Sequence, residues 1–167
     1  TGEGEVTPGA STLENHGDLK RIGNNSPRYR VGLNLDAAWK GIDFSIFFQG
    51  VLKRDWMFDA GDPYFWGAGS GMWQAACFEE HMDYWTPENT DAYYPKPYFN
   101  ETKNQQAQDA YMQKASYLRC KNIQLGYTLP THITEKAGIS NCRIYLSCDN
   151  LFTITGLSSV YDPEAFG

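Results

Sequence analysis

The segment from residue 54 to residue 115 holds the side chains best suited to contacting a ligand. It carries 14 of the chain's 25 aromatic residues, and its acidic residues outnumber its basic ones by ten to four. Aromatic rings stack on the C–H groups of sugars, and carboxylates accept hydrogen bonds from sugar hydroxyls. The candidates for ligand contact are Phe65, Trp66, Trp73 and Trp85, and neighbouring glycines could leave the first three exposed. The same aromatic residues would also suit a core of the segment itself, or docking against a partner protein.

The remaining reactive residue types are not spaced for catalysis or for zinc binding. Neither the three scattered histidines nor the four cysteines form a pattern that supports a nucleophile or a metal site. Five acidic residues could gather around a calcium ion or simply stay in solvent: Asp59, Asp62, Glu79, Glu80 and Asp83. We expect no enzyme activity, no metal and no cofactor. A net charge of −6 without a basic stripe also argues against a nucleic-acid partner.

Two runs of alternating apolar and polar residues come immediately before this segment. Residues 28–40 alternate almost throughout, and residues 42–53 do the same after a tight turn at Lys40-Gly41. A period of two is typical of a β-strand with one apolar and one polar face. Each run exceeds the roughly 5–6 residues usual for a soluble strand and fits the roughly 9–11 that cross a bilayer at a tilt. The sequence therefore predicts a membrane-spanning hairpin.

Two further strands are predicted at about 116–129 and 141–154, joined by a short connection that could hold one helical turn. Short connections thus alternate with long ones, and the loop 54–115 far exceeds the roughly 12–15 residues usual in a compact domain. This alternation is typical of an outer-membrane β-barrel with long extracellular loops. The predicted fold is all-β, with antiparallel transmembrane strands. The absence of an initial Met and of a signal peptide indicates a piece of something larger.

Charge decides which face of each strand can meet lipid, because an Arg or Lys facing the bilayer midplane costs about 2–4 kcal/mol. The charged faces of the first and fourth strands must therefore point into the barrel lumen. Seven residues are predicted to face the lumen: Arg28, Arg30, Asn34, Asp36, Arg143, Tyr145 and Asp149. On the opposite face of the fourth strand, four residues would meet lipid: Ile144, Leu146, Cys148 and Phe152.

The third strand does not fit this division of faces. Arg119 and Lys121 have the same parity as Ile123 and Leu125, which are predicted to face lipid. The two basic residues could lie at the outer interface, where the cost of a charge falls. Alternatively, a β-bulge between the two pairs could shift the register. The sequence leaves both arrangements open.

Several sequence blocks, taken in order along the chain, resemble a single family. They are GLNL at 32–35 with QG at 49–50, YWTPEN at 84–89, YLRCKNIQLGYTLP at 117–130, and RIYLS, DNLFT and YDPE between 143 and 164. Together they resemble the SusC/RagA family of TonB-dependent outer-membrane transporters of Bacteroidetes. The match runs from about residue 23 to residue 164. It departs from the family pattern at Cys120 and Cys148, and it lacks the last strand, the plug domain and the TonB box.

The resemblance implies the C-terminal part of an outer-membrane barrel of about 22 strands with a plugged lumen. It also implies uptake of oligosaccharides or peptides, captured under a SusD-like surface lipoprotein. Energy would come from the TonB complex, which would act through the absent upstream region. The chain would then contribute barrel wall, in contact with outer-membrane lipid, and extracellular loops.

Two other classes of protein remain compatible with the residues alone. A secreted β-sandwich module that binds carbohydrate would dissolve without detergent and would have both faces of its sheet covered by protein. A structural or adhesive surface barrel would lack a plug and a lipoprotein neighbour.

Overall fold

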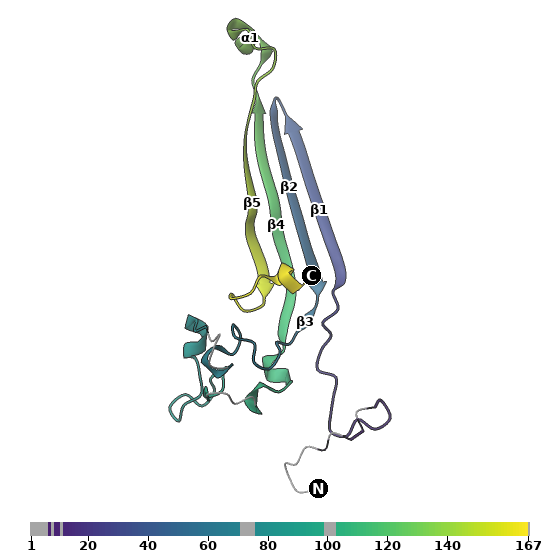
Figure 1. Ribbon diagram of the computed structural model, residues 1–167. Coiled ribbons are helices and arrows are strands. Elements are labelled where there is room, and N and C mark those ends of the chain that lie inside the picture. Colours follow the sequence, from purple (N-terminus) through teal and green to yellow (C-terminus); the bar gives the residue numbers. More distant parts are fainter. Residues whose placement is uncertain (1–6, 8, 11, 71–75, 99–102, 167) are drawn as a thin grey trace.

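A computed structural model describes residues 7, 9–10, 12–70, 76–98 and 103–166 of the chain. Four long strands form a single antiparallel layer in the order β1 (Arg28–Trp39), β2 (Ile42–Lys53), β4 (Gln113–Thr128) and β5 (Arg143–Gly156) (Figure 1). The two-residue strand β3 (Asp55–Trp56) continues the edge of β2 along β4. The predicted all-β fold is confirmed, and each long strand begins and ends within three residues of its predicted bounds.

The helical elements are all single turns. The helical turn predicted between the last two strands is present as α1 (Thr131–Thr134) and η5 (Glu135–Ala137). The other short helices are η1 (Gly67–Gly69), η2 (Glu79–Met82), η3 (Lys103–Gln105), η4 (Asp109–Tyr111) and η6 (Pro163–Phe166). None of the helices in the described ranges is long and apolar enough to cross a membrane.

A two-residue turn joins β1 to β2. Lys40 and Gly41 have φ values of 48° and 86°, and two positive φ values in succession are the mark of a type I′ turn, whose twist matches that of the flanking strands. A Cβ atom on Gly41 would lie 2.9 Å from the carbonyl oxygen of Thr128, so β4 leaves no room for a side chain there. This turn and α1 lie at one end of the sheet, and the long loop lies at the other (Figure 1).

The register divides the side chains of the sheet into an apolar face and a polar face. Residues directly opposite each other in antiparallel strands share a face, and Leu35 of β1 pairs with Ile46 of β2, which pairs with Ile123 of β4. The apolar face continues across β4 and β5 through Leu118, Cys120, Leu125, Tyr127, Ile144, Leu146, Cys148, Phe152 and Ile154. Apart from Lys114, which pairs with Gly156 at the loop end of β4, this register places no charged residue of the four long strands on the apolar face.

A β-bulge in β4 preserves this separation. Asn122 pairs with Phe47 of β2, but Cys120 pairs with the adjacent Phe48, so Lys121 is an extra residue in the ladder. A bulge of one residue reverses the parity of the strand on its two sides. Arg119 therefore lies on the same face as Asn122. Of the two arrangements that the sequence left open, the bulge is the correct one.

The apolar face is uncovered by the described parts of the chain. Leu146 is 75% exposed, and Leu33, Leu125 and Ile154 are exposed as well. A β-sandwich would bury such a face beneath a second sheet, so the described residues do not support the binding-module alternative. A continuous apolar surface of this kind marks contact with lipid or with another protein.

The two faces of β5 provide a matched test. Cys148 lies on the apolar face and Ser147 on the polar face, and both side chains are small. In the intact protein, Cys148→Arg should lower the free energy of unfolding in lipid vesicles by about 2–4 kcal/mol, because the charge would face hydrocarbon. Ser147→Arg should leave it nearly unchanged. Urea titration of the fraction folded measures both, and equal losses for the two variants would contradict the prediction that the apolar face alone meets lipid.

Candidate functional site

Residues 157–166 follow β5 and fold back over the polar face of the sheet, with η6 beside β4 (Figure 1). We call this segment the strap. Arg119 Nη2 donates a hydrogen bond to Asp162 at 2.7 Å, and its Nη1 donates to Glu164 at 2.8 Å. Lys121 Nζ lies 3.0 Å from the same Glu164 carboxylate. Two cations of β4 therefore hold two carboxylates of the strap.

Arg119 is the centre of this ion network. It is only 8% exposed, and a buried guanidinium is costly unless opposite charges and hydrogen bonds compensate for its lost hydration. Its Nε donates to Oγ1 of Thr153 on β5 at 2.7 Å, and its two Nη groups meet the strap carboxylates. The hydrogen bond from Arg119 holds the pKa of Asp162 below its ordinary value of 3.8.

The start of the strap is attached to the long loop. The hydroxyls of Ser158 and Ser159 each donate a hydrogen bond of 2.6 Å to Glu80. Burial alone would raise the pKa of Glu80, but the hydrogen bonds to its carboxylate outweigh burial and bring the pKa below its ordinary value of 4.5. The strap is thus held at two places, by Glu80 of the loop at its start and by Arg119 and Lys121 of β4 near its end.

Aromatic residues form the core of the long loop and include the strap. Phe58 stacks on Phe65 with ring centroids 4.5 Å apart, and on Tyr161 of the strap with centroids 4.2 Å apart. Tyr161 also donates a hydrogen bond to Asp62. The buried cluster continues through Trp66, Tyr94, Tyr111, Ala115 and Leu157. The loop, the start of β4 and the strap therefore pack as one unit at the end of the sheet.

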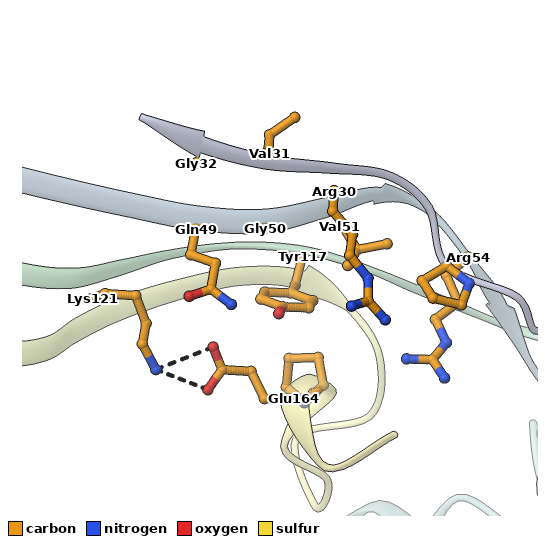
Figure 2. A pocket seen from close by; sticks show the side chains of 12 residues that line it. Arg30, Val31, Gly32, Gln49, Gly50, Val51, Arg54, Tyr117, Lys121 and Glu164 are labelled. Carbon is orange, nitrogen blue, oxygen red and sulfur yellow. Dashed lines mark hydrogen bonds and ion pairs between the residues drawn. The ribbon is translucent and has the colours of Figure 1, made fainter. Parts of the chain in front are cut away.

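A cavity of about 450 Å³ lies between the strap and the strands. Figure 2 shows Arg30, Arg54 and Tyr117 extending from the strands to the side on which Glu164 of the strap lies. The lining is completed by Pro27, Val31, Gly32, Gln49, Gly50, Val51, Lys121 and Pro163. The strap thus covers part of the polar face and encloses a space above β1, β2 and β4.

Comparisons with known proteins fit this arrangement of long strands and a long loop. No family model matches the chain. It is 32% identical over 148 residues to TonB-dependent receptor P3 of Formosa agariphila, and 26% identical over 147 residues to TonB-dependent receptor P26 of the same organism. These matches include 89% and 88% of the chain, and the chain spans 14% of the length of each receptor.

Solved structures agree with the sequence matches. The RagAB peptide importer in its open-open state superposes with a TM-score of 0.64 at 28% identity, over 96% of this chain and 18% of that chain. The RagAB peptide transporter superposes with a TM-score of 0.62 at 28% identity, over 98% of this chain and 18% of that chain. The chain belongs to the SusC/RagA-like TonB-dependent receptors. Its long strands are accordingly part of a β-barrel wall.

Two of the ligand contacts predicted for this receptor segment lie in the aromatic core. Phe65 is 1% exposed and Trp66 is 5% exposed, and the indole N–H of Trp66 donates to the carbonyl of Asp59 at 2.9 Å. The expectation that glycines leave these rings exposed is wrong. Gly67 instead packs against the imidazole of His81, where a Cβ would approach within 2.7 Å. Trp73 lies outside the described residues.

Trp85 is the predicted ligand contact that the receptor segment leaves open to solvent. It is 41% exposed and borders a cavity of about 370 Å³ that Tyr98 and Lys96 also line. The adjoining turn is rigid, because Thr86 and Asn89 exchange backbone hydrogen bonds of 3.2 and 3.0 Å. An aromatic ring beside polar groups can stack on a sugar or on an apolar side chain. Ligand contact at Trp85 stays a prediction.

The seven residues predicted to face the lumen share the polar face of the sheet: Arg28, Arg30, Asn34, Asp36, Arg143, Tyr145 and Asp149. Arg143 of β5 reaches Asp43 of β2 at 2.5 Å by crossing over β4. It crosses at Gly126, where a Cβ would lie 2.6 Å from both side chains. This explains the glycine near the end of β4. That the polar face is lumenal stays a prediction.

Three of the five acidic residues considered for calcium bind protein groups through their carboxylates, namely Asp62, Glu80 and Asp83. Asp83 accepts hydrogen bonds from the side-chain amide of Asn89 at 3.0 Å and from the backbone N–H of Tyr93 at 3.2 Å. Asp62 and Glu80 hold the strap, as described above. Within the described ranges, no group of three or more His, Cys, Asp or Glu residues is placed to hold a metal ion.

Arg54 and the strap are functional candidates that the sequence alone did not predict. Arg54 is 5% exposed and donates hydrogen bonds to the backbone carbonyls of Asn25 and Phe166. In the sequence, Arg54 stands out only as a second basic residue directly after Lys53, at the point where the alternation of β2 ends. Its two carbonyl partners are far away in the chain, so no local pattern predicts them.

Acid should release the strap. A carboxylate whose pKa is depressed in the folded state stabilises that state above its ordinary pKa, and the stabilisation is lost as the pH falls through the depressed value. For Asp162 and Glu80 this loss begins below about pH 4, the region of their ordinary pKa values. Hydrogen exchange of the intact receptor in nanodiscs should show strap amides protected at pH 7 and pH 5 and unprotected at pH 3, after correction for intrinsic rates.

The same measurement at pH 7 isolates the ion network. Arg119→Gln should weaken strap protection by about 1–3 kcal/mol, because hydrogen bonds to charged groups are worth that much. Arg143→Gln removes an ion pair of the polar face that does not touch the strap, and it should leave strap protection unchanged. Protection that survives both acid and Arg119→Gln would mean that the aromatic contacts alone hold the strap.

Proposed function

We propose that this chain supplies wall strands and a surface loop to an outer-membrane importer of nutrients. The observation that carries the proposal is the continuous and uncovered apolar face of the four long strands, which is free of charge except for Lys114 at the loop end. In water such a face would drive aggregation, whereas against lipid hydrocarbon it is stable. The receptor matches and the RagAB superpositions support the same conclusion.

The lengths of the strands support a position across the membrane. β1 and β2 each have 12 residues, β4 has 16 and β5 has 14. A tilted strand needs roughly 9–11 residues to cross a bilayer, so each strand has enough. The longer β4 and β5 extend toward the long loop, whose packed core lies at that end of the sheet.

The end of the sheet with the long loop is the extracellular end in this proposal. Outer-membrane barrels keep short turns on the periplasmic side and long loops outside. The two-residue turn at Lys40-Gly41 and the α1 connection would therefore face the periplasm. The aromatic core, the strap and Trp85 would face the outside, where a ligand arrives.

The transported molecule is an oligosaccharide or a peptide. Sugar binding is supported by the exposed Trp85 ring beside polar side chains. Peptide uptake is supported by the superposition on the RagAB peptide importer at 28% identity. In either case the family resemblance supplies two partners: a SusD-like lipoprotein that closes over the loops, and the TonB complex that delivers energy.

Uptake by whole cells tests the proposal. Fluorescent oligosaccharides and fluorescent short peptides are given to cells with the intact receptor, to cells without it, and to cells treated with a protonophore. One of the two classes should accumulate only where both the receptor and the proton gradient are present. Accumulation that is independent of the receptor for both classes would contradict import by this protein.

Trp85→Ala should raise the concentration for half-maximal uptake by about 3- to 10-fold, because an aromatic contact contributes about 0.5–1.5 kcal/mol. Trp39→Ala is the matched control, since Trp39 is an exposed tryptophan on the apolar face at the turn end of the sheet. That variant should leave half-maximal uptake unchanged at equal surface expression. An unchanged value for Trp85→Ala would exclude Trp85 as a ligand contact.

A further inference from the structure

The cavity beneath the strap is basic in a chain that is acidic. Three of its lining residues are cations, namely Arg30, Arg54 and Lys121, and one is an anion, Glu164. The chain as a whole carries a net charge of −6. The concentration of positive charge around this space is therefore a local feature, opposite to the trend of the chain.

Two of the three cations have no carboxylate partner among the described residues. Glu164 is engaged by Lys121 at 3.0 Å and by Arg119 at 2.8 Å, so its charge is already compensated. The ion pairs of the described chain include neither Arg30 nor Arg54. The cavity thus keeps two uncompensated guanidinium groups.

Two hydrogen bonds and one aromatic ring hold the side chain of Arg54 at the cavity. Its Nε donates to the carbonyl of Asn25 at 2.9 Å, and Nη2 donates to the carbonyl of Phe166. Its guanidinium also lies over the Trp56 ring, 5.0 Å from the ring centroid. No described residue accepts a hydrogen bond from Nη1. Burial, and then the like charge of Arg30, lower the pKa of Arg54.

We propose that the cavity beneath the strap binds a carboxylate group of the transported molecule, between Arg30 and Arg54. A planar carboxylate matches the fork of a guanidinium, and its negative charge offsets part of the positive charge of the two arginines. Apolar groups of Val51 and Pro163 line the rest of the cavity and can contact the carbon skeleton that bears the carboxylate. This inference rests on the proposed import function and names the charge class of its substrate.

Two substrates can present this group: a peptide through its C-terminus, and an oligosaccharide through a uronic acid. The experiment uses a matched pair of probes for each. The peptide probes are one short peptide with a free C-terminus and the same peptide with an amidated C-terminus. The sugar probes are an oligosaccharide of uronic acids and its carboxyl-reduced neutral form. Binding of all four to the intact receptor in detergent is measured at equilibrium.

In one of the two pairs, the carboxylate form should bind at least tenfold more tightly than its neutral form, in line with the strength of hydrogen bonds between charged groups. Arg30→Gln should remove this preference, and since Arg30 is exposed and makes no ion pair, the variant should fold normally. Lys136→Gln removes one positive charge from the exposed turn at the opposite end of the sheet and should keep the preference. Arg54→Lys should weaken the preference while retaining the charge, because a lysine lacks the fork.

Equal binding of the charged and neutral forms in both pairs, or a preference that survives Arg30→Gln, would overturn the carboxylate site. Such a result beside receptor-dependent uptake would leave the import proposal intact. Conversely, an Arg30-dependent preference without receptor-dependent uptake would keep the binding site and reject import. The two proposals can therefore fail separately.

Discussion

The structure depends on one constraint: the charged side chains that the long strands place within the bilayer must lie on the same face of a single sheet. Alternation along β1, β2 and β5 places all the charged residues of these strands on the polar face. β4 would violate it, since Arg119 and Lys121 have the parity of Ile123. Against hydrocarbon each such cation would cost about 2–4 kcal/mol. The extra residue at Lys121 removes this cost at the expense of a local break in the ladder.

The same bulge creates the anchor for the strap. The bulge places Arg119 and Lys121 on the polar face. There they form ion pairs with Asp162 and Glu164 of the strap. The strap in turn carries Tyr161 into the aromatic core of the long loop. The bulge that keeps two cations away from lipid therefore also joins the long loop to the barrel wall through the strap. The basic cavity lies between the strap and the strands.

The sequence predicts those parts of the molecule that follow from local periodicity. The four long strands, their polar and apolar faces and the tight turn at Lys40-Gly41 all follow from period-two alternation and turn chemistry. The bulge was foreseeable only as one of two solutions, because its choice depends on Asp162 and Glu164, some forty residues further along. The burial of Phe65 and Trp66 was not predictable from their flanking glycines. A glycine lacks a side chain whether it opens a loop or allows close packing, and only tertiary contacts with His81 and Tyr111 decide between the two.

Fluorescence quenching by brominated lipids along β5 shows directly whether the apolar face of the sheet meets lipid. Single cysteines at positions 143 to 149 of the intact receptor, with its native cysteines replaced, carry a small fluorophore in bilayers of brominated or ordinary lipid. If the apolar face meets lipid, quenching should be strong at 144, 146 and 148 and weak at 143, 145, 147 and 149. Quenching that is uniform along the strand, or strongest at the odd positions, would contradict this prediction.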